Sequence, residues 1–457
     1  MLPITRISRC LQDTMTSANI AIFLSIVASF LCCRYEITTG GLSRYCDYSL
    51  RQIFRFLLQK QDWLAIRLSL LIDFFYQKDQ TYIVAVDEVV EGKSGHHSFG
   101  LAKFYSSCSQ KTIQGLCFFA LSLINCKTKT SYLLNILQVI YTEVDKQRIA
   151  EKKEKTKQGK LRTQEGKNLP KGRKAKEANP TKETSEKKEV KENFTASFRV
   201  FKELFTNSIN LLKKMLPDIK IAFLVADTAY GTIDYLNVAE EYACKLISKM
   251  KSNVALYEPA QKEKGKKGRP PLYGKKIDLA NIATKHLKKT EQKDGKTYQY
   301  YQFPAYNKAI KGILLTILVL VTTDQKGKIS TNVWFSNDCN ISYETLLEYY
   351  KMRFQIEFHF RDAKQHFGLA DFKNYKEKNL TNFVNLSFTM CLMAEIILQQ
   401  ARVELQNPKL SVLDIKIIFN AQYIAKKIIK FLRIDDRNNF YSNNIAKFIP
   451  TDIINRA

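Results

Sequence analysis

The segment SYETLLEYYKMRFQIEFHFRDAKQHF, residues 342–367, decides what fold we expect for the rest of the chain. It contains neither Pro nor Gly and is long enough for about seven helical turns at about 3.6 residues each. Ser342 is a suitable N-cap, so we expect one continuous helix to begin there. At roughly 100° per residue, one face of this helix is apolar and should join the core. That face carries Met352, Ile356, Phe360, Ala363 and Phe367.

A second face of the same helix carries most of its polar chemistry. One carboxylate, three cations and a phenol fall within a sector of about 80°. These residues are Tyr350, Arg353, Glu357, Arg361 and Lys364. An ordinary solvated helix face also mixes charges, and this is one interpretation. The other is a metal-binding carboxylate flanked by side chains that grip phosphates.

The spacing of this polar face favours the second interpretation. Tyr350-x2-Arg353-x3-Glu357-x6-Lys364 resembles the Y-(2)-R-(3)-E-(6)-K signature of DDE-class bacterial insertion-sequence transposases of the cut-and-paste group. The resemblance implies an α/β, RNase H-like catalytic core with helical regions at both ends. It also implies that two aspartates on hydrophobic strands precede Glu357.

Both aspartates are present, each directly after an apolar run. TYIVAV (81–86) leads into Asp87, and IKIAFLVA (219–226) leads into Asp227. Such runs indicate central strands that are buried on both faces. A carboxylate at the end of a buried strand either caps a turn or binds something. If the two strands are neighbours, the two carboxylates lie at one edge of the sheet.

The resemblance extends to the second aspartate and to the chemistry. The stretch ADTAYG (226–231) is similar to the second-Asp motif of the same transposase group. The resemblance therefore implies that Asp87, Asp227 and Glu357 are catalytic and hold two Mg²⁺ (or Mn²⁺) ions. Carboxylate oxygens suit such hard cations.

Charge and composition set the class of partner. The chain has 457 residues, so we expect two or three domains. The net charge of +28, from 72 Lys and Arg against 44 Asp and Glu, predicts a polyanion, either nucleic acid or an anionic membrane. Part of this excess comes from residues 145–192, which have too few apolar side chains to fold alone and which we expect to be a disordered or solvated insertion. The ten Cys contain no C-x-x-C, so zinc-finger spacing is absent, and scattered Cys suit a reducing cytosol.

Residues 1–76 predict an N-terminal helical DNA-binding domain. The apolar stretch 18–33 is shorter than the roughly 20 residues that a membrane span needs. We interpret it as a buried helix, with a membrane anchor as the alternative, and we expect no membrane partner. A Gly40-Gly41 turn precedes a helix with Arg51 and Arg55, which is typical of a helix–turn–helix module. An ordinary helical cap on a larger domain is the other interpretation.

The remaining segments follow the expected core in order. Runs at 112–126 and 131–141 predict two strands that complete an antiparallel meander with the first strand. The core would occupy residues 77–250, be interrupted by a β-rich insertion at 251–336, and resume with the helix of the third acid at 337–372. Helical periodicity then predicts a C-terminal helical region over 373–457.

Two further residues are candidates for DNA contact, beside Tyr350, Arg353, Arg361 and Lys364. Arg269 lies in a lysine-flanked GRP sequence that could enter a minor groove, although a basic surface hairpin gives the same pattern. Trp334 is one of two Trp in the chain. The resemblance implies that it stacks on a base flipped from the transposon end, whereas a Trp on a strand is also an ordinary core residue.

The resemblance, which the acids and the basic charge support, implies that the chain is a transposase. It would bind the terminal inverted repeats of its own mobile element and catalyse metal-dependent cleavage and strand transfer on double-stranded DNA, as a homodimer in the bacterial cytoplasm. Three other functions remain open: a decayed copy that only binds DNA, an RNase H-like nuclease without strand transfer, and a membrane-surface protein.

Overall fold

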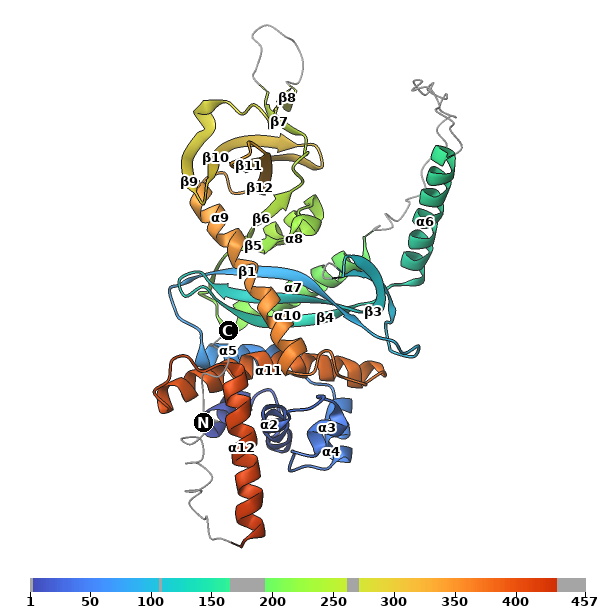
Figure 1. Ribbon diagram of the computed structural model, residues 1–457, viewed down its shortest axis with the longest axis vertical. Coiled ribbons are helices and arrows are strands. Elements are labelled where there is room, and N and C mark those ends of the chain that lie inside the picture. The colour runs from blue at the N-terminus through green and yellow to red at the C-terminus, as the bar shows by residue number, and fades with distance from the viewer. Residues whose placement is uncertain (1–2, 107–108, 165–193, 261–270, 434–457) are drawn as a thin grey trace.

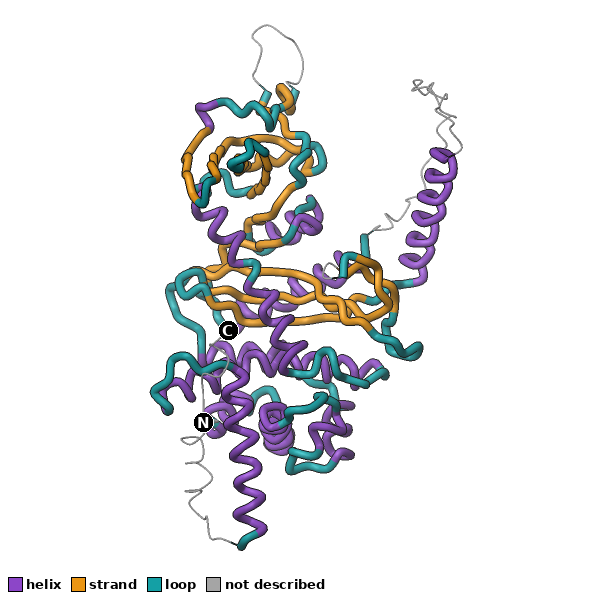
Figure 2. The backbone as a smooth tube through the Cα atoms, viewed as in Figure 1, coloured by secondary structure: helices purple, strands orange, loops and turns teal. Residues whose placement is uncertain are grey.

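The computed structural model describes residues 3–106, 109–164, 194–260 and 271–433 (Figure 1). These residues form one large mixed sheet, which continues into the strand-rich part at the top of Figure 1, with helices packed beneath its lower half in that view. Figure 2 shows the same division, with helices gathered at the base and strands in the middle and at the top. The fold is therefore mixed α/β, as the sequence predicts.

The sheet has twelve strands in the described residues, in the order β2-β3-β1-β5-β6-β12-β11-β10-β7-β8, with β4 paired to β3 and β9 paired to β10. The strands of its first half are β1 (Thr81–Gly92), β2 (Ala102–Ser106), β3 (Lys111–Asn125), β4 (Thr130–Val139), β5 (Lys220–Ala226) and β6 (Lys245–Met250). Those of its second half are β7 (Leu256–Pro259), β8 (Tyr273–Lys276), β9 (Leu287–Lys293), β10 (Lys296–Asn307), β11 (Ile310–Thr323) and β12 (Ile329–Ser336). The strands predicted at 81–87, 112–126, 131–141 and 219–227 are confirmed.

The pairing of β1 decides where the first aspartate lies. β1 runs antiparallel to β3 as far as Gly92, and parallel to β5 only as far as Ala85, which is level with Val225. The two aspartate-bearing strands are neighbours, which meets the condition under which both carboxylates lie at one edge of the sheet. The expectation that the first strand ends at Asp87 is wrong, because pairing with β3 continues for five more residues. This close pairing requires Gly115, since a Cβ there would collide with the carbonyl oxygen of Glu91.

Helices from both ends of the chain form the layer beneath the sheet (Figure 1). They are α1 (Ile4–Leu11), α2 (Ser17–Cys32), α3 (Thr39–Ser43), α4 (Leu50–Leu58), α5 (Trp63–Phe74), α11 (Glu377–Glu404) and α12 (Val412–Phe431). The prediction that the apolar stretch 18–33 is a buried helix is confirmed, since α2 packs against α12. The predicted Gly40-Gly41 turn is wrong, because both glycines lie within α3, whose N-cap Thr38 accepts a hydrogen bond from Gly41 N.

Helix α11 is a core helix of this layer. Among the described residues it is the one helix long and apolar enough to cross a membrane, and 89% of that apolar window is buried inside the protein. It packs against α4, α5, α10, α12 and β4. Its apolar character is therefore explained by this packing.

Three more helices flank the sheet. Helix α7 (Ala196–Met215) covers β3 and β4, and α8 (Ile233–Glu241) packs on β6. Helix α6 (Glu143–Gln164) projects from the body in Figure 1. Residues 145–164 are therefore helical rather than disordered, and the side chains of 151–158 are exposed to solvent. The Lys, Glu and Gln of this segment have high helix propensity even without an apolar face. The rest of the stretch 145–192 lies outside the described residues.

The segment 342–367 forms two helices, which corrects the expectation of one. Helix α9 (Tyr343–Met352) begins at Ser342, whose hydroxyl accepts a hydrogen bond from Thr345 N as predicted, and α10 (Gln355–His366) follows a short break. At the break the backbone hydrogen bonds join residues three apart instead of four. Arg353 N donates to Tyr350 O, and Ile356 N donates to Arg353 O.

The break separates two sets of packing partners. Helix α9 packs on β5, β6 and β12, whereas α10 packs on β1, β4 and α11. The five predicted core residues are all buried, but they divide between two hydrophobic clusters. Met352 joins Trp334 and Leu346 in one cluster, and Ile356 joins Phe360 in the other. A single straight helix could not place these apolar residues in both clusters.

Candidate active site

The three predicted acids come from three different elements. Asp87 lies in the middle of β1, Asp227 follows the last residue of β5, and Glu357 lies in the first turn of α10. Because Ala85 is level with Val225 in the parallel pair, Asp87 and Asp227 lie at the same level of the sheet. The carbonyl oxygen of Asp227 accepts a hydrogen bond from Ser248 Oγ at 3.0 Å, which anchors the turn after β5 to β6.

Two side chains near the α9–α10 break link these acids. Arg353 donates from Nη1 to Asp87 Oδ2 at 2.6 Å and from Nη2 to Glu357 Oε1 at 3.0 Å. The Tyr350 hydroxyl donates to Asp227 Oδ1 at 3.2 Å. The Arg353 and Asp87 side chains are 13% and 21% exposed, so their ion pair is largely shielded from water, whereas Glu357 is 38% exposed. All three carboxylates are therefore held by one short segment of chain.

Burial and neighbouring charges set the protonation states of Asp87 and Tyr350. Burial raises the pKa of Asp87 to about 6, although the Arg353 guanidinium acts to lower it. Burial, with the nearby Asp227 carboxylate, raises the pKa of the Tyr350 phenol to about 12. Tyr350 is therefore a hydrogen-bond donor at neutral pH, and the carboxyl of Asp87 takes up a proton just below neutrality.

The two remaining candidates on the polar helix face, Lys364 and Arg361, lie in different surroundings. Lys364 contacts β1 just beyond Asp87, through Val90 O at 3.0 Å and Glu91 Oε2 at 3.1 Å. Arg361 instead pairs with its neighbour Asp362 at 3.1 Å, and its side chain is 54% exposed. The structure thus brings Tyr350, Arg353, Glu357 and Lys364 to the aspartate-bearing strands but leaves Arg361 at the surface.

The two other candidates for DNA contact are Trp334, which the structure describes, and Arg269, which it does not. The ring of Trp334, on β12, is 7% exposed and meets the Tyr350 ring edge-on at a centroid distance of 5.9 Å. Its indole Nε1 is buried with no hydrogen-bond partner among the described residues. Arg269 lies outside the described residues.

An aromatic pocket of about 420 Å³ adjoins the acids and shares Tyr350 and Arg353 with them. Its other lining residues are Tyr298, Tyr300, Leu320, Trp334, Leu347, Lys351 and Phe354. The sequence analysis did not single out Tyr298, Tyr300, Lys351 or Phe354. The alternation of Tyr298 and Tyr300 in β10 was the available signal, since residues two apart on a strand share one face.

The oxygen donors of this site fit hard divalent cations in their chemistry. Their positions fit less closely, because no group of three or more His, Cys, Asp or Glu in the described part of the chain could hold a metal ion. Arg353 lies between Asp87 and Glu357, so these two carboxylates could share an ion only after the guanidinium had moved aside.

Residues 10–303 match the family described as DDE superfamily endonuclease. This range includes Asp87 and Asp227 and ends before Glu357. No curated protein matches the chain significantly.

Proposed function

Because the chain belongs to the DDE superfamily endonuclease family, we propose that it is a transposase that binds the terminal inverted repeats of its own mobile element and cuts and joins DNA there. Nucleases of this superfamily act on DNA and generally use divalent metal ions. The observation that supports a catalytic role most strongly is that Tyr350 and Arg353 link carboxylates from β1, β5 and α10. The Tyr-Arg-Glu-Lys spacing favours the cut-and-paste group within the family.

The three acids, Arg353 and Lys364 have different roles in the proposed reaction. Asp87, Asp227 and Glu357 would hold two Mg²⁺ or Mn²⁺ ions, which supply activation of water and stabilisation of the leaving 3′ oxygen when bound. Arg353 would exchange its carboxylate partners for a phosphate of the incoming DNA, since its planar fork binds both groups in the same way. Lys364 would hold a second phosphate beside β1. No covalent bond between protein and DNA is needed.

The aromatic pocket is suited to an unpaired base at the cleaved end. Because the Trp334 ring is buried, we propose that Tyr298, Tyr300 and Phe354 provide the stacking surfaces, each base–aromatic stack contributing about 1–3 kcal/mol. Trp334 Nε1–H and Arg353 Nε–H are both buried and lack acceptors within the described residues.

The proposal also covers architecture and assembly. β1, β3, β4, β5 and β6 with α10 would form an RNase H-like core, and residues 251–336 would be an insertion that extends the sheet. Two element ends must be cut together, so we propose that the chain acts as a homodimer, in the bacterial cytoplasm.

A second candidate function is DNA binding without cleavage, as in a decayed copy. One observation favours it: the acids do not converge closely enough to hold a metal in the described structure, because Arg353 lies between two of them. A nuclease without strand transfer would need the acids but not the Tyr, Arg and Lys around them.

A cleavage assay tests the proposed function directly. The substrate is an end-labelled duplex that carries the terminal sequence flanking the gene, incubated with Mg²⁺ and either wild type or Glu357→Gln. We expect cleavage at the repeat boundary by wild type, and unchanged DNA binding without cleavage by the variant. Glu344→Gln, an exposed acid in the first turn of α9, is the matched control and should cleave normally.

The other outcomes of this assay are equally informative. Binding without cleavage by every protein would support the DNA-binding candidate. Cleavage that survives Glu357→Gln would show that this carboxylate is not part of the active site. Cleavage without joining of the freed 3′ end to a target duplex would support the simple nuclease.

A further inference from the structure

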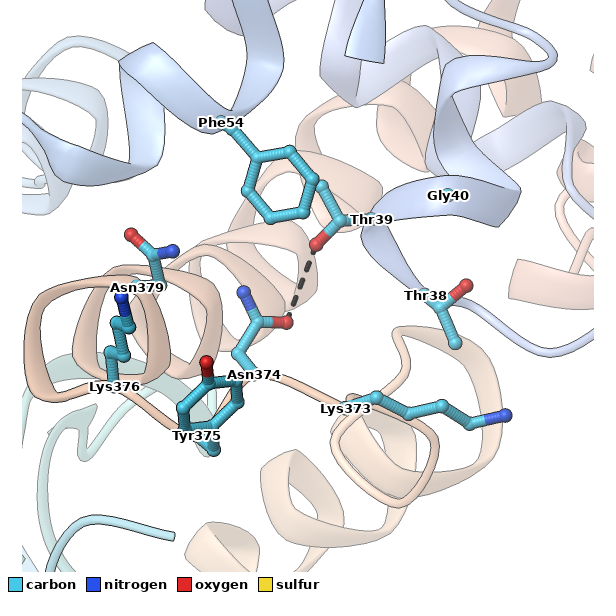
Figure 3. Close-up of a pocket in the computed structure, with 9 residues that line it drawn as sticks. All are labelled: Thr38, Thr39, Gly40, Phe54, Lys373, Asn374, Tyr375, Lys376 and Asn379. Carbon is cyan, nitrogen blue, oxygen red and sulfur yellow. Dashed lines mark hydrogen bonds between the residues drawn. The ribbon is translucent and has the colours of Figure 1, made fainter. Parts of the chain in front are cut away.

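A second pocket, separate from the aromatic one, lies between α4 and the start of α11 (Figure 3). We call it the α4–α11 pocket, and it encloses about 470 Å³. Its walls come from an N-terminal and a C-terminal segment. They consist of Thr38, Thr39, Gly40, Phe54, Lys373, Asn374, Tyr375, Lys376 and Asn379.

The polar side chains of this pocket include several hydrogen-bond donors. Figure 3 shows Thr39 and Asn374 linked at the centre, with Lys376 and Asn379 on one side and Thr38 and Lys373 on the other. Thr39 donates to the Asn374 carbonyl oxygen at 3.3 Å, which leaves the Asn374 amide N–H₂ available. Thr38 Oγ1 already accepts from Gly41 N, so its hydroxyl proton is free to point elsewhere.

The two lysines give the pocket a positive charge. Lys373 pairs with Glu36 at 2.9 Å, but the two side chains are 72% and 69% exposed, so the pair is weak and readily exchanged. Lys376 has no ion pair with any acid in the described ranges, and its Nζ lies 6.0 Å from the Tyr375 ring centroid. A ligand that carries negative charge would gain from both lysines.

The start of α11 adds to this charge. The N-cap is Lys376, whose side chain cannot accept the hydrogen bond that an N-cap normally accepts, and no side-chain cap is present. The first backbone N–H groups of a helix of 28 residues are thus left for another acceptor. Phosphate oxygens are such acceptors.

The pocket is joined to the aspartate-bearing strand by short contacts. Tyr375 O accepts a hydrogen bond from Phe99 N at 2.9 Å, in the loop that follows β1. Lys93, just beyond the end of β1, donates to Phe372 O at 3.0 Å and lies 3.7 Å from the Phe372 ring centroid. DNA held in the pocket would therefore be positioned relative to the strand that carries Asp87.

We propose that the α4–α11 pocket binds a phosphodiester group of the DNA backbone, so that both terminal helical regions grip the element end while the acids cut it. This inference rests on the proposed function, because it requires that the chain binds DNA. The contact is to the backbone and carries no base specificity by itself.

Binding of a labelled duplex, measured by fluorescence anisotropy over a range of salt with EDTA present, tests the pocket without cleavage. The variant is Lys373→Gln/Lys376→Gln, and the control is Lys378→Gln, a lysine in the same helical turn that does not line the pocket. For each phosphate contact that is lost, the slope of log K against log [salt] should fall by about 0.9. We expect a fall of about 1 to 2 in the variant and little change in the control. Thermal unfolding checks that each protein is folded.

Each outcome separates the inference from the proposed function. An unchanged salt slope in the double variant, with wild-type DNA binding intact, would overturn the pocket assignment alone. If wild type does not bind DNA at all, the proposed function fails. Inorganic phosphate and a mononucleotide are titrated in parallel. Saturable binding of either that needs both lysines, without any effect of the lysines on DNA binding, would assign the pocket to a small phosphate compound and overturn the DNA proposal.

Discussion

Arg353 shows how one side chain can organise an acidic site. Its guanidinium contacts Asp87 and Glu357 with short bonds, and its Nε remains without an acceptor in the described structure. A planar group with five donors can hold two carboxylates in this way, whereas a lysine ammonium would act as a single point charge. The same residue lines the aromatic pocket, so it can respond to DNA and to the acids together.

Removal of this guanidinium should free the acids for a metal ion. We expect Arg353→Gln to bind Mn²⁺ about tenfold more tightly than wild type without DNA, because charge-assisted hydrogen bonds worth about 1.5–3 kcal/mol no longer compete. Cleavage should nevertheless fall, since the phosphate contact is lost. Mn²⁺ titration followed by electron paramagnetic resonance measures the affinity. Arg361→Gln is the control, and equal Mn²⁺ affinity in all three proteins would contradict the prediction.

The pKa of Asp87 predicts a dependence of stability on pH. Its pKa rises from 3.8 to about 6 on folding, mainly through burial, so the native state binds more protons than the unfolded state between these values. The contribution of Asp87 to stability is therefore present below pH 4 and is lost as the pH rises through 6, at about 1.4 kcal/mol per pKa unit. Urea unfolding of metal-free protein at pH 4 to 7 should show a flatter profile for Asp87→Asn. Parallel profiles would rule this out.

Elements in this protein end where their packing partners change. Helices α9 and α10 separate within a stretch that has high helix propensity and no Pro or Gly, because their apolar residues face two different clusters. Helix α10 then ends before Gly368, which has a φ of +73° and lies against Ile37 of the N-terminal region. The chain thus turns at a point where two distant segments touch.

Gly368 should tolerate no side chain. A Cβ there would lie 2.7 Å from Ile37 side-chain and carbonyl atoms, and the left-handed backbone adds about 1–2 kcal/mol of strain. We expect Gly368→Ala to lower the free energy of unfolding by more than Gly327→Ala, which has a similar φ of +77° but open space around it. Urea unfolding of both variants isolates the cost of the collision. Equal losses would mean that the contact with Ile37 relaxes freely.

At the scale of the whole molecule, the N-terminal and C-terminal helices form one layer under the sheet. Arg67 of α5 is fully buried and donates hydrogen bonds to Leu134 O and Asn135 of β4 and to Asn385 and Thr389 of α11. These partners are neutral acceptors. One side chain therefore joins elements that lie more than 300 residues apart in sequence.

Loss of Arg67 should loosen both terminal regions together. We expect Arg67→Ala to lower the free energy of unfolding by about 3 kcal/mol or more, because several buried acceptors lose their donor and a cavity remains. Urea unfolding measures this loss, and limited proteolysis should show cleavage near α1–α5 and α11 at the same rate. Arg51→Ala, at an exposed position of α4, is the control. Cleavage confined to one end would show that the two regions are held independently.

The sequence by itself determined the elements that depend on local patterns. Continuous apolar runs predict β1 and β5, and the helical repeat of 342–367 predicts which residues are buried, because burial of an apolar face follows from periodicity alone. The spacing of Tyr350, Arg353, Glu357 and Lys364 predicts which side chains approach the acids. Glu357 could be linked to Asp87 and Asp227 only through the resemblance to a family.

The tertiary structure alone decided what depends on contacts between distant segments. The extension of β1 to Gly92, the break at Arg353 and the two pockets all arise where residues far apart in sequence meet. Arg361 falls in the same helical sector as Arg353, yet it pairs with Asp362 at the surface whereas Arg353 contacts Asp87. Local periodicity places a side chain on a face of its own helix, but only packing against the sheet determines what that face meets.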